Sequence, residues 1–123
     1  MIKMTTTLYQ RLGGEQLVAA MLNELLDRMW EDDQINHHFV GLDKINIRKF
    51  FIAYFNTYIF NGPPSYIGPS LKTAHKGLQI TSEEYEIGIT HLHTALKNHS
   101  VSIEDTARIE AFIRMIKPHI INQ

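Results

Sequence analysis

An all-α fold is predicted by the spacing of the apolar residues and by the residue types at the breaks between apolar runs. Apolar residues recur every three or four positions, rather than in alternation, along most of the 123-residue chain. Ser, Thr and Gly stand where these runs start or stop, as they do at helix ends. We expect one domain over residues 1–123, because the chain is long enough for one core and too short for two.

The first third of the chain predicts two helices and a turn. Thr7 can cap a short helix, which Gly13 and Gly14 end. Apolar residues over 17–29 then mark a long amphipathic helix, and a brief helical turn follows around 33–39.

The middle of the chain predicts an aromatic-rich helix and then a loop. Phe, Tyr and Ile recur at helical spacing over 47–59, and we expect this helix to be deeply buried. The Gly- and Pro-rich segment 61–68 cannot continue the helix, so it should form a loop that leads to a short helix ending in His75.

Two further helices complete the prediction. Thr81 and Glu84 form a capping-box pattern, which starts a helix reaching about residue 98. Ser102 starts a last helix, which ends near Pro118.

The composition excludes several classes of function. Twelve basic and 13 acidic residues give a net charge of −1, so no broad basic field is available to grip nucleic acid. The absence of Cys excludes disulfides and thiolate metal sites. Residues 1–7 lack an apolar run of leader length, and no segment is long enough to span a membrane. We expect a soluble cytoplasmic protein, either a monomer or a weak oligomer.

His75 is the candidate metal ligand. Pro69 suits the first turn of its helix, and Leu71, Ala74 and Leu78 share its apolar face. A neutral imidazole in such surroundings suits the proximal side of a haem iron. The alternative is a core histidine that is hydrogen-bonded to the backbone.

Four motifs in order carry a family resemblance. They are Leu8-Tyr9-Gln10-Arg11-Leu12-Gly13-Gly14, Phe39, Thr57-Tyr58-Ile59-Phe60-Asn61-Gly62, and Tyr66-x-Gly68-x-x-Leu71-Lys72-x-Ala74-His75-Lys76-x-Leu78. With these motifs the chain resembles a truncated haemoglobin of group I. The resemblance implies a globin-like two-over-two helical sandwich with haem b between the aromatic helix and the His75 helix.

The resemblance also implies roles for individual residues. His75 corresponds to the proximal ligand, and Phe39 to a phenylalanine that packs on the haem face. Tyr66 and Lys72 match positions near a haem propionate, and Leu71 and Leu78 flank the ligand on the same helical face.

The distal side departs from the family pattern. Leu26 stands where group I members usually place a tyrosine that hydrogen-bonds the iron-bound ligand. Counting back from Thr57 puts Arg48, Phe51 and Ile52 at the pocket positions, where the family often carries polar residues. The spacing between Phe39 and Thr57 is one residue longer than in typical relatives, so these three assignments can shift by one. An apolar pocket of Leu26, Phe39, Phe51 and Ile52 is expected.

The remaining histidines do not predict a second metal site. His91 and His93 lie about 200° apart around a helix and cannot chelate one ion. His37 and His38 are adjacent and are expected in a solvated bend. His99 and His119 fall at helix ends, where the helix dipole favours them.

Three functions remain open. The first is reversible binding of a diatomic gas, namely oxygen, carbon monoxide or nitric oxide, at haem iron. The second is a redox enzyme such as a nitric oxide dioxygenase, which would need a reductase. No general acid or base is evident at the pocket positions, which disfavours an enzyme. The third is a haem-based gas sensor module, or a module that has lost haem.

Overall fold

The computed structural model describes residues 6–123 and contains helices and loops without strands in that range. Residues 1–5, part of the segment in which no leader is expected, lie outside the described residues. Within the described range, no helix combines the length and the apolar character needed to cross a membrane. The helices, in chain order, are α1 (Leu8–Arg11), α2 (Glu15–Trp30), the 3-10 helix η1 (Asn36–Phe39), α3 (Lys44–Tyr54), the π-helical turn η2 (Phe55–Ile59), α4 (Leu71–His75), α5 (Ser82–Asn98), α6 (Ile103–Ile116) and the 3-10 helix η3 (Lys117–His119).

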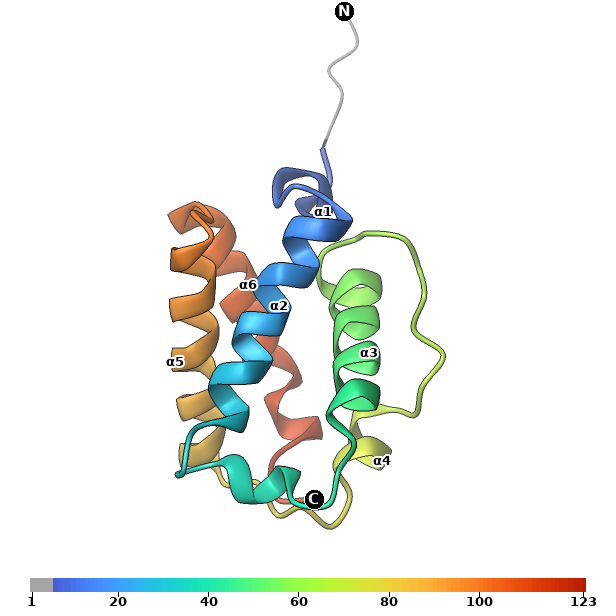
Figure 1. The fold of residues 1–123 in the computed structure, drawn as a ribbon, viewed down its shortest axis with the longest axis vertical. Coiled ribbons are helices and arrows are strands. Elements are labelled where there is room, and N and C mark those ends of the chain that lie inside the picture. The colour runs from blue at the N-terminus through green and yellow to red at the C-terminus, as the bar shows by residue number, and fades with distance from the viewer. Residues whose placement is uncertain (1–5) are drawn as a thin grey trace, which may run out of the picture.

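The long helices form two packed pairs, α2 with α3 and α5 with α6. α2 also packs against α5, and this contact joins the two pairs. In Figure 1, α2 crosses in front of α6, with α5 on one side and α3 on the other. This two-over-two arrangement confirms the predicted fold class.

The core lies where α2, α5 and α6 meet. Val18 and Leu22 of α2, Leu96 of α5 and Ile109 of α6 are completely buried and belong to one apolar cluster. Phe60, directly after the π turn, is equally buried and joins α3 to this cluster. The apolar stripes that the sequence shows at helical spacing therefore face one another in the core.

Side-chain caps start the helices where the sequence places them. The Thr7 hydroxyl accepts a hydrogen bond from the Gln10 amide at 3.1 Å, which begins α1. Thr81 and Glu84 form the predicted capping box: the Thr81 hydroxyl accepts from the Glu84 amide at 3.1 Å, and Glu84 Oε1 accepts from the Thr81 amide at 2.9 Å. Both caps satisfy amides that a helix leaves without a backbone partner.

The aromatic helix is not deeply buried, so that expectation is wrong. Of its aromatic residues, Phe55 is buried, whereas Phe50 is 40% and Tyr58 53% exposed. Phe50 and Phe51 both line a cavity, although Phe51 also packs against the core cluster. A helix that borders a cavity keeps part of its apolar face out of the packed core.

A π-helical turn interrupts the regular geometry at the end of this helix. The Phe60 amide donates to the Phe55 carbonyl at 2.8 Å, five residues back instead of four. Such a turn holds one more residue than an α-helical turn, and it commonly lies close to a functional site. It therefore changes the helical phase between the first part of α3 and residues after 59.

We predict that Leu22→Ala lowers the free energy of unfolding by about 2–5 kcal/mol, because Leu22 is completely buried and little can collapse into the space. Leu17→Ala is the matched control, with the same chemistry on the same helix at a residue that is 57% exposed. It should change the free energy by about 0.5 kcal/mol or less. Urea unfolding followed by circular dichroism measures both, and equal effects would contradict the assigned core.

Candidate functional site

An apolar cavity of about 310 Å³ lies between α3 and the His75 helix and extends to α5. Its volume falls within the range of about 300–1,000 Å³ that is common for small-molecule and cofactor sites. The cavity wall contains residues of α2, η1, α3, η2, α4, α5 and α6, of the loops between them and of the C-terminal segment. It consists of Leu25, Leu26, Met29, Ile35, His38, Phe39, Leu42, Ile47, Phe50, Phe51, Tyr54, Phe55, Tyr66, Leu71, Ala74, His75, Leu78, Ile80, Glu84, Tyr85, Gly88, Ile89, Leu92, Ile113, Ile116 and Ile120.

His75 lies in the cavity wall with a defined ring orientation. Its Nδ1 is 2.7 Å from the Leu71 carbonyl oxygen, one helical turn earlier. A carbonyl only accepts, so Nδ1 must carry the proton and Nε2 keeps its lone pair. Burial lowers the pKa of His75, although the bond to Leu71 opposes this effect. The imidazole is therefore held neutral with Nε2 available as a ligand.

The helix that carries His75 begins later than the sequence suggests. Pro69 is not in its first turn; α4 begins at Leu71, and Ser70 is its cap, with the Ser70 hydroxyl accepting from the Thr73 amide at 3.2 Å. Five residues are too few for a helix that is stable alone. The segments on either side must therefore hold α4 in place.

The loop before α4 is anchored on α3 and its π turn. The Thr57 hydroxyl accepts hydrogen bonds from the amides of Ser65 at 2.9 Å and Tyr66 at 3.0 Å. The Tyr66 ring packs edge-on against Phe50 and Tyr54, with centroid distances of 6.3 and 5.2 Å. These contacts fix the part of the loop that leads to α4 relative to the aromatic helix.

The loop leaves η2 through two residues with special backbone requirements. Asn61 adopts a positive φ of 55°, which asparagine tolerates better than most residues. A side chain at Gly62 would place its Cβ 2.5 Å from the Tyr9 ring of α1. The Asn-Gly pair therefore lets the chain turn sharply and pass close to α1.

The segment after α4 is held by the C-terminus of the chain. The Gln123 carbonyl accepts from the amides of Gly77 at 3.1 Å and Gln79 at 3.2 Å, and the Asn122 amide donates to the Ile80 carbonyl at 2.8 Å. Residues 77–80 are thus hydrogen-bonded in part to the last two residues of the sequence. The His75 helix is therefore held by Thr57 through the loop before it and by the C-terminal residues through the segment after it.

The distal register differs from the one obtained by counting back from Thr57. Arg48 and Ile52 do not line the cavity; the residues that do are Ile47, Phe50 and Phe51. Ile52 packs against the core cluster, and the Arg48 guanidinium lies 3.6 Å from the Asp27 carboxylate. The reason is the π turn, which accommodates the extra residue after these positions and so shifts the assignments by one.

The other expected residues of the apolar wall do line the cavity. Leu26 of α2 is 1% exposed, and Phe39 stacks on Trp30 with a centroid distance of 4.4 Å. Phe51 packs against the core cluster, with its ring 4.8 Å from that of Phe55 between centroids. Their aliphatic and aromatic groups present no hydrogen-bond donor.

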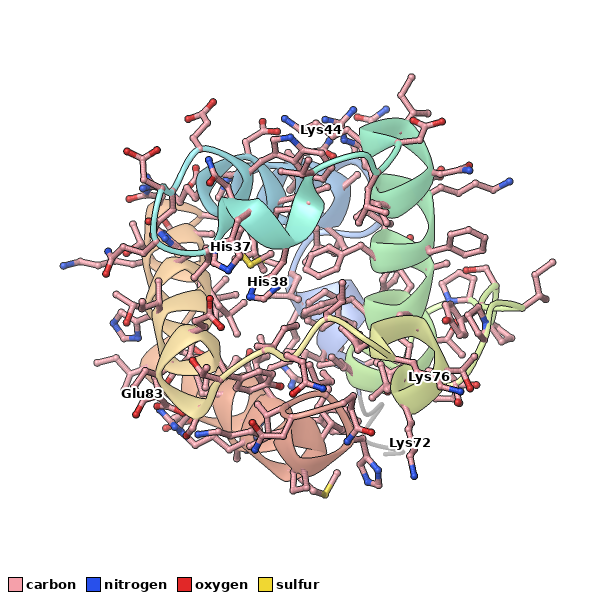
Figure 2. All side chains as sticks on the ribbon, turned by 90° about the horizontal axis from the view of Figure 1, so that it is seen from below. His37, His38, Lys44, Lys72, Lys76 and Glu83 are labelled. Carbon is pink, nitrogen blue, oxygen red and sulfur yellow. The ribbon has the colours of Figure 1, made fainter. Side chains whose placement is uncertain are left out.

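Around His75, Tyr66, Leu71 and Leu78 line the cavity as expected, and Lys72 does not. The Tyr66 hydroxyl donates to the Pro69 carbonyl, and Figure 2 shows the Lys72 side chain extending away from the centre of the molecule. Lys72 is therefore a solvated lysine in this structure.

Two polar residues of the wall were not foreseen. His38 of η1 and Glu84 of α5 line the cavity, and His38 Nε2 is 2.9 Å from Glu84 Oε2. The side chain of His38 is 12% exposed, so the expectation that it lies in a solvated bend is wrong. The pocket also contains a potential acid and base after all. The two residues are 46 positions apart, so no local pattern could have joined them.

The model of the family described as bacterial-like globin matches residues 7–122. The group 1 truncated haemoglobin of a Synechocystis species is 31% identical over 86% of this chain and 88% of its own length. The corresponding protein of Nostoc commune is 28% identical over 96% of this chain and 99% of its own length. The chain belongs to the group 1 truncated haemoglobins of this family.

Solved structures agree on the fold. The truncated haemoglobin of Tetrahymena pyriformis in its Fe(III) form superposes with a TM-score of 0.88 at 24% identity, covering 96% of this chain and 100% of that one. The 2/2 haemoglobin of a Synechococcus species, solved with covalently attached haem, gives 0.83 at 22% identity over 93% of this chain and 94% of its own. At these identities the likeness establishes the two-over-two fold.

Truncated haemoglobins bind haem and gas ligands, and the residues of this chain fit such a group. The cavity wall is overwhelmingly aliphatic and aromatic, as a flat apolar macrocycle requires. One wall carries an imidazole with a free Nε2, and the opposite wall carries Phe50 and Phe51 of α3.

We predict that stability falls as the pH is lowered from 7 through about 6.5, the ordinary pKa of histidine. The folded protein keeps His75 neutral at pH values where the unfolded chain protonates it, so unfolding takes up a proton. Urea unfolding between pH 7 and 5 measures this, above the range where carboxylates titrate. His75→Leu should show a weaker pH dependence than the unmodified protein; the same dependence in both would contradict the prediction.

Proposed function

We propose that this chain reversibly binds a diatomic gas on haem b, with His75 as the proximal ligand and an apolar distal pocket. The observation that carries the proposal is the neutral His75 imidazole, whose Nδ1 is bonded to the Leu71 carbonyl and whose Nε2 is free at the cavity. A haem held here would supply a ferrous iron with an open position for the gas.

The proximal residues would orient and tune the ligand. A hydrogen bond from Nδ1 to a carbonyl fixes the ring and its tautomer and makes Nε2 a stronger donor to a metal. Leu71 and Ala74, which line the cavity beside His75, would pack on the macrocycle and exclude water. Exclusion of water favours retention of a neutral ligand.

The distal residues supply the specificity. Leu26 and Phe51 would border the gas ligand without donating a hydrogen bond, which favours weakly polar ligands such as carbon monoxide over oxygen. A hydrogen bond to a partly charged ligand contributes about 1.5–3 kcal/mol, which corresponds to roughly a tenfold to hundredfold effect on retention. The expected pocket consequently differs from a polar one mainly in how fast it releases oxygen.

Two of the three cavity tyrosines donate their hydroxyls to backbone carbonyls, and the third packs its ring against neighbouring tyrosines. The Tyr85 hydroxyl donates to the Ile113 carbonyl at 2.7 Å, and the Tyr66 hydroxyl donates to Pro69. Tyr54 packs against Tyr58 and Tyr66, with centroids 4.9 and 5.2 Å away. Burial raises the pKa of all three cavity tyrosines, so they remain neutral phenols at physiological pH.

We predict that His75→Ala abolishes the strong Soret band of the purified ferrous protein, because it removes the proposed iron ligand. The matched control is His93→Ala, an exposed histidine paired with Glu110, which should keep the spectrum of the unmodified protein. Absorption spectra of the ferric, ferrous and carbon monoxide forms measure both. An unchanged ferrous spectrum for His75→Ala would refute the proximal assignment.

We predict that Leu26→Tyr slows oxygen dissociation about tenfold to hundredfold, because its hydroxyl would donate to the bound gas. Leu26→Phe is the matched control, since it adds similar bulk at a fully buried position without the hydroxyl. Stopped-flow displacement of oxygen by carbon monoxide gives both rates. If the Phe and Tyr variants release oxygen equally fast, position 26 does not face the ligand.

A further inference from the structure

A second cluster of ligand-type side chains lies at the edge of the cavity. It consists of His37 and His38 of η1 and Glu84 in the first turn of α5, and it will be called the corner cluster. Its ligand atoms, one from each residue, all lie within 4.8 Å of one another. Figure 2 shows the two imidazoles extending from η1 on the side of the molecule where α5 lies.

One carboxylate oxygen is shared by both imidazoles. Glu84 Oε2 is 3.1 Å from His37 Nε2 and 2.9 Å from His38 Nε2. Among the described residues, the other histidine–carboxylate pairs are one-to-one: His91 with Asp32, His93 with Glu110 and His99 with Glu24. The convergence of three ligand atoms distinguishes the corner cluster from an ordinary surface ion pair.

The spacing of these atoms suits a small divalent ion. Zinc binds imidazole nitrogen and carboxylate oxygen at about 2.0–2.2 Å, so neighbouring ligand atoms of a tetrahedral site lie roughly 3.3 Å apart. The distances from Glu84 Oε2 to the two Nε2 atoms are within a few tenths of an ångström of that value, and the two imidazole ligand atoms lie within 4.8 Å of each other. Two imidazoles and a carboxylate also form a ligand set that zinc uses in proteins, with water in the fourth position.

The carboxylate is held in position independently of the histidines. Glu84 Oε1 accepts from the Thr81 amide in the capping box of α5, and Oε2 is left to face His37 and His38. Hydrogen bonds to the ligating carboxylate commonly orient it and strengthen metal binding. Burial by itself would raise the pKa of Glu84, but its bonds to Thr81 and His38 hold that pKa below the usual value, so the carboxylate is charged.

We propose that His37, His38 and Glu84 bind a divalent transition-metal ion of the zinc class, separate from the iron proposed at His75. Nε2 of each histidine and Oε2 of Glu84 are the ligand atoms. The bound ion connects η1 to the start of α5 and leaves a position for water or an exogenous ligand. None of its ligands is the proposed iron ligand, although His38 and Glu84 also line the cavity.

The test is isothermal titration calorimetry, in which zinc ions are added to the purified protein at neutral pH. The unmodified protein should bind one zinc ion, and His37→Ala and His38→Ala should each weaken binding at least about tenfold. His37 is 58% exposed, so its replacement does not threaten the fold. The matched control His93→Ala should bind as the unmodified protein does.

Glu84→Gln tests the carboxylate without removing the cap. Glutamine can serve in a capping box as glutamate does, so α5 keeps its start while the site loses its negative charge. Zinc binding should again fall at least about tenfold, with an unchanged circular dichroism spectrum. Failure of the unmodified protein to bind zinc stoichiometrically, or equal affinity in His37→Ala, His38→Ala or Glu84→Gln, overturns the proposal. The Soret band of the same samples reports the His75 site separately.

Discussion

The constraint on which the rest of the structure depends is that a five-residue helix must hold one imidazole in one orientation. α4 is too short to be stable alone, and its His75 ring is aligned by a single bond to the Leu71 carbonyl. The stability of α4 therefore comes from outside it. Thr57 anchors the preceding loop, and the Gln123 carbonyl pairs with the segment that follows. Two distant parts of the chain thus hold the segments on either side of α4.

The opposite wall of the cavity is positioned by a different device. Most of α3 is regular. The π turn that follows it contains one additional residue, which changes the angular position around the helix axis of the residues before the turn relative to those after it. Ile47, Phe50 and Phe51 consequently face the cavity, and Arg48 is directed to Asp27. One inserted residue therefore places the aliphatic side chain of Ile47, instead of the Arg48 guanidinium, at the cavity, while Phe60 stays in the core.

The sequence predicts what local patterns determine. The α2 stripe, the Thr81 and Glu84 capping box and the loop over 61–68 depend on residues close in sequence, and all three are found. The family resemblance and the fold class are confirmed, whereas ligation of iron by His75 stays a prediction. The sequence does not locate the π turn, because no local pattern indicates where an extra residue is accommodated. The positions of Arg48 and Ile52 therefore stayed open to a shift of one residue, and the structure places both outside the cavity lining. The pairing of His38 with Glu84 spans 46 positions and depends on the packing of η1 against α5.

Glu84 belongs both to the cap of α5 and to the corner cluster, because its two oxygens have different partners. Oε1 completes the cap of α5, and Oε2 faces His37 and His38. The cap removes the rotational freedom of the carboxylate, so placing Oε2 beside the imidazoles requires little further loss of side-chain entropy. His38 and Glu84 also line the cavity. The same hydrogen bond that starts a helix therefore shapes the rim of the proposed haem site and presents an oriented anion at its corner.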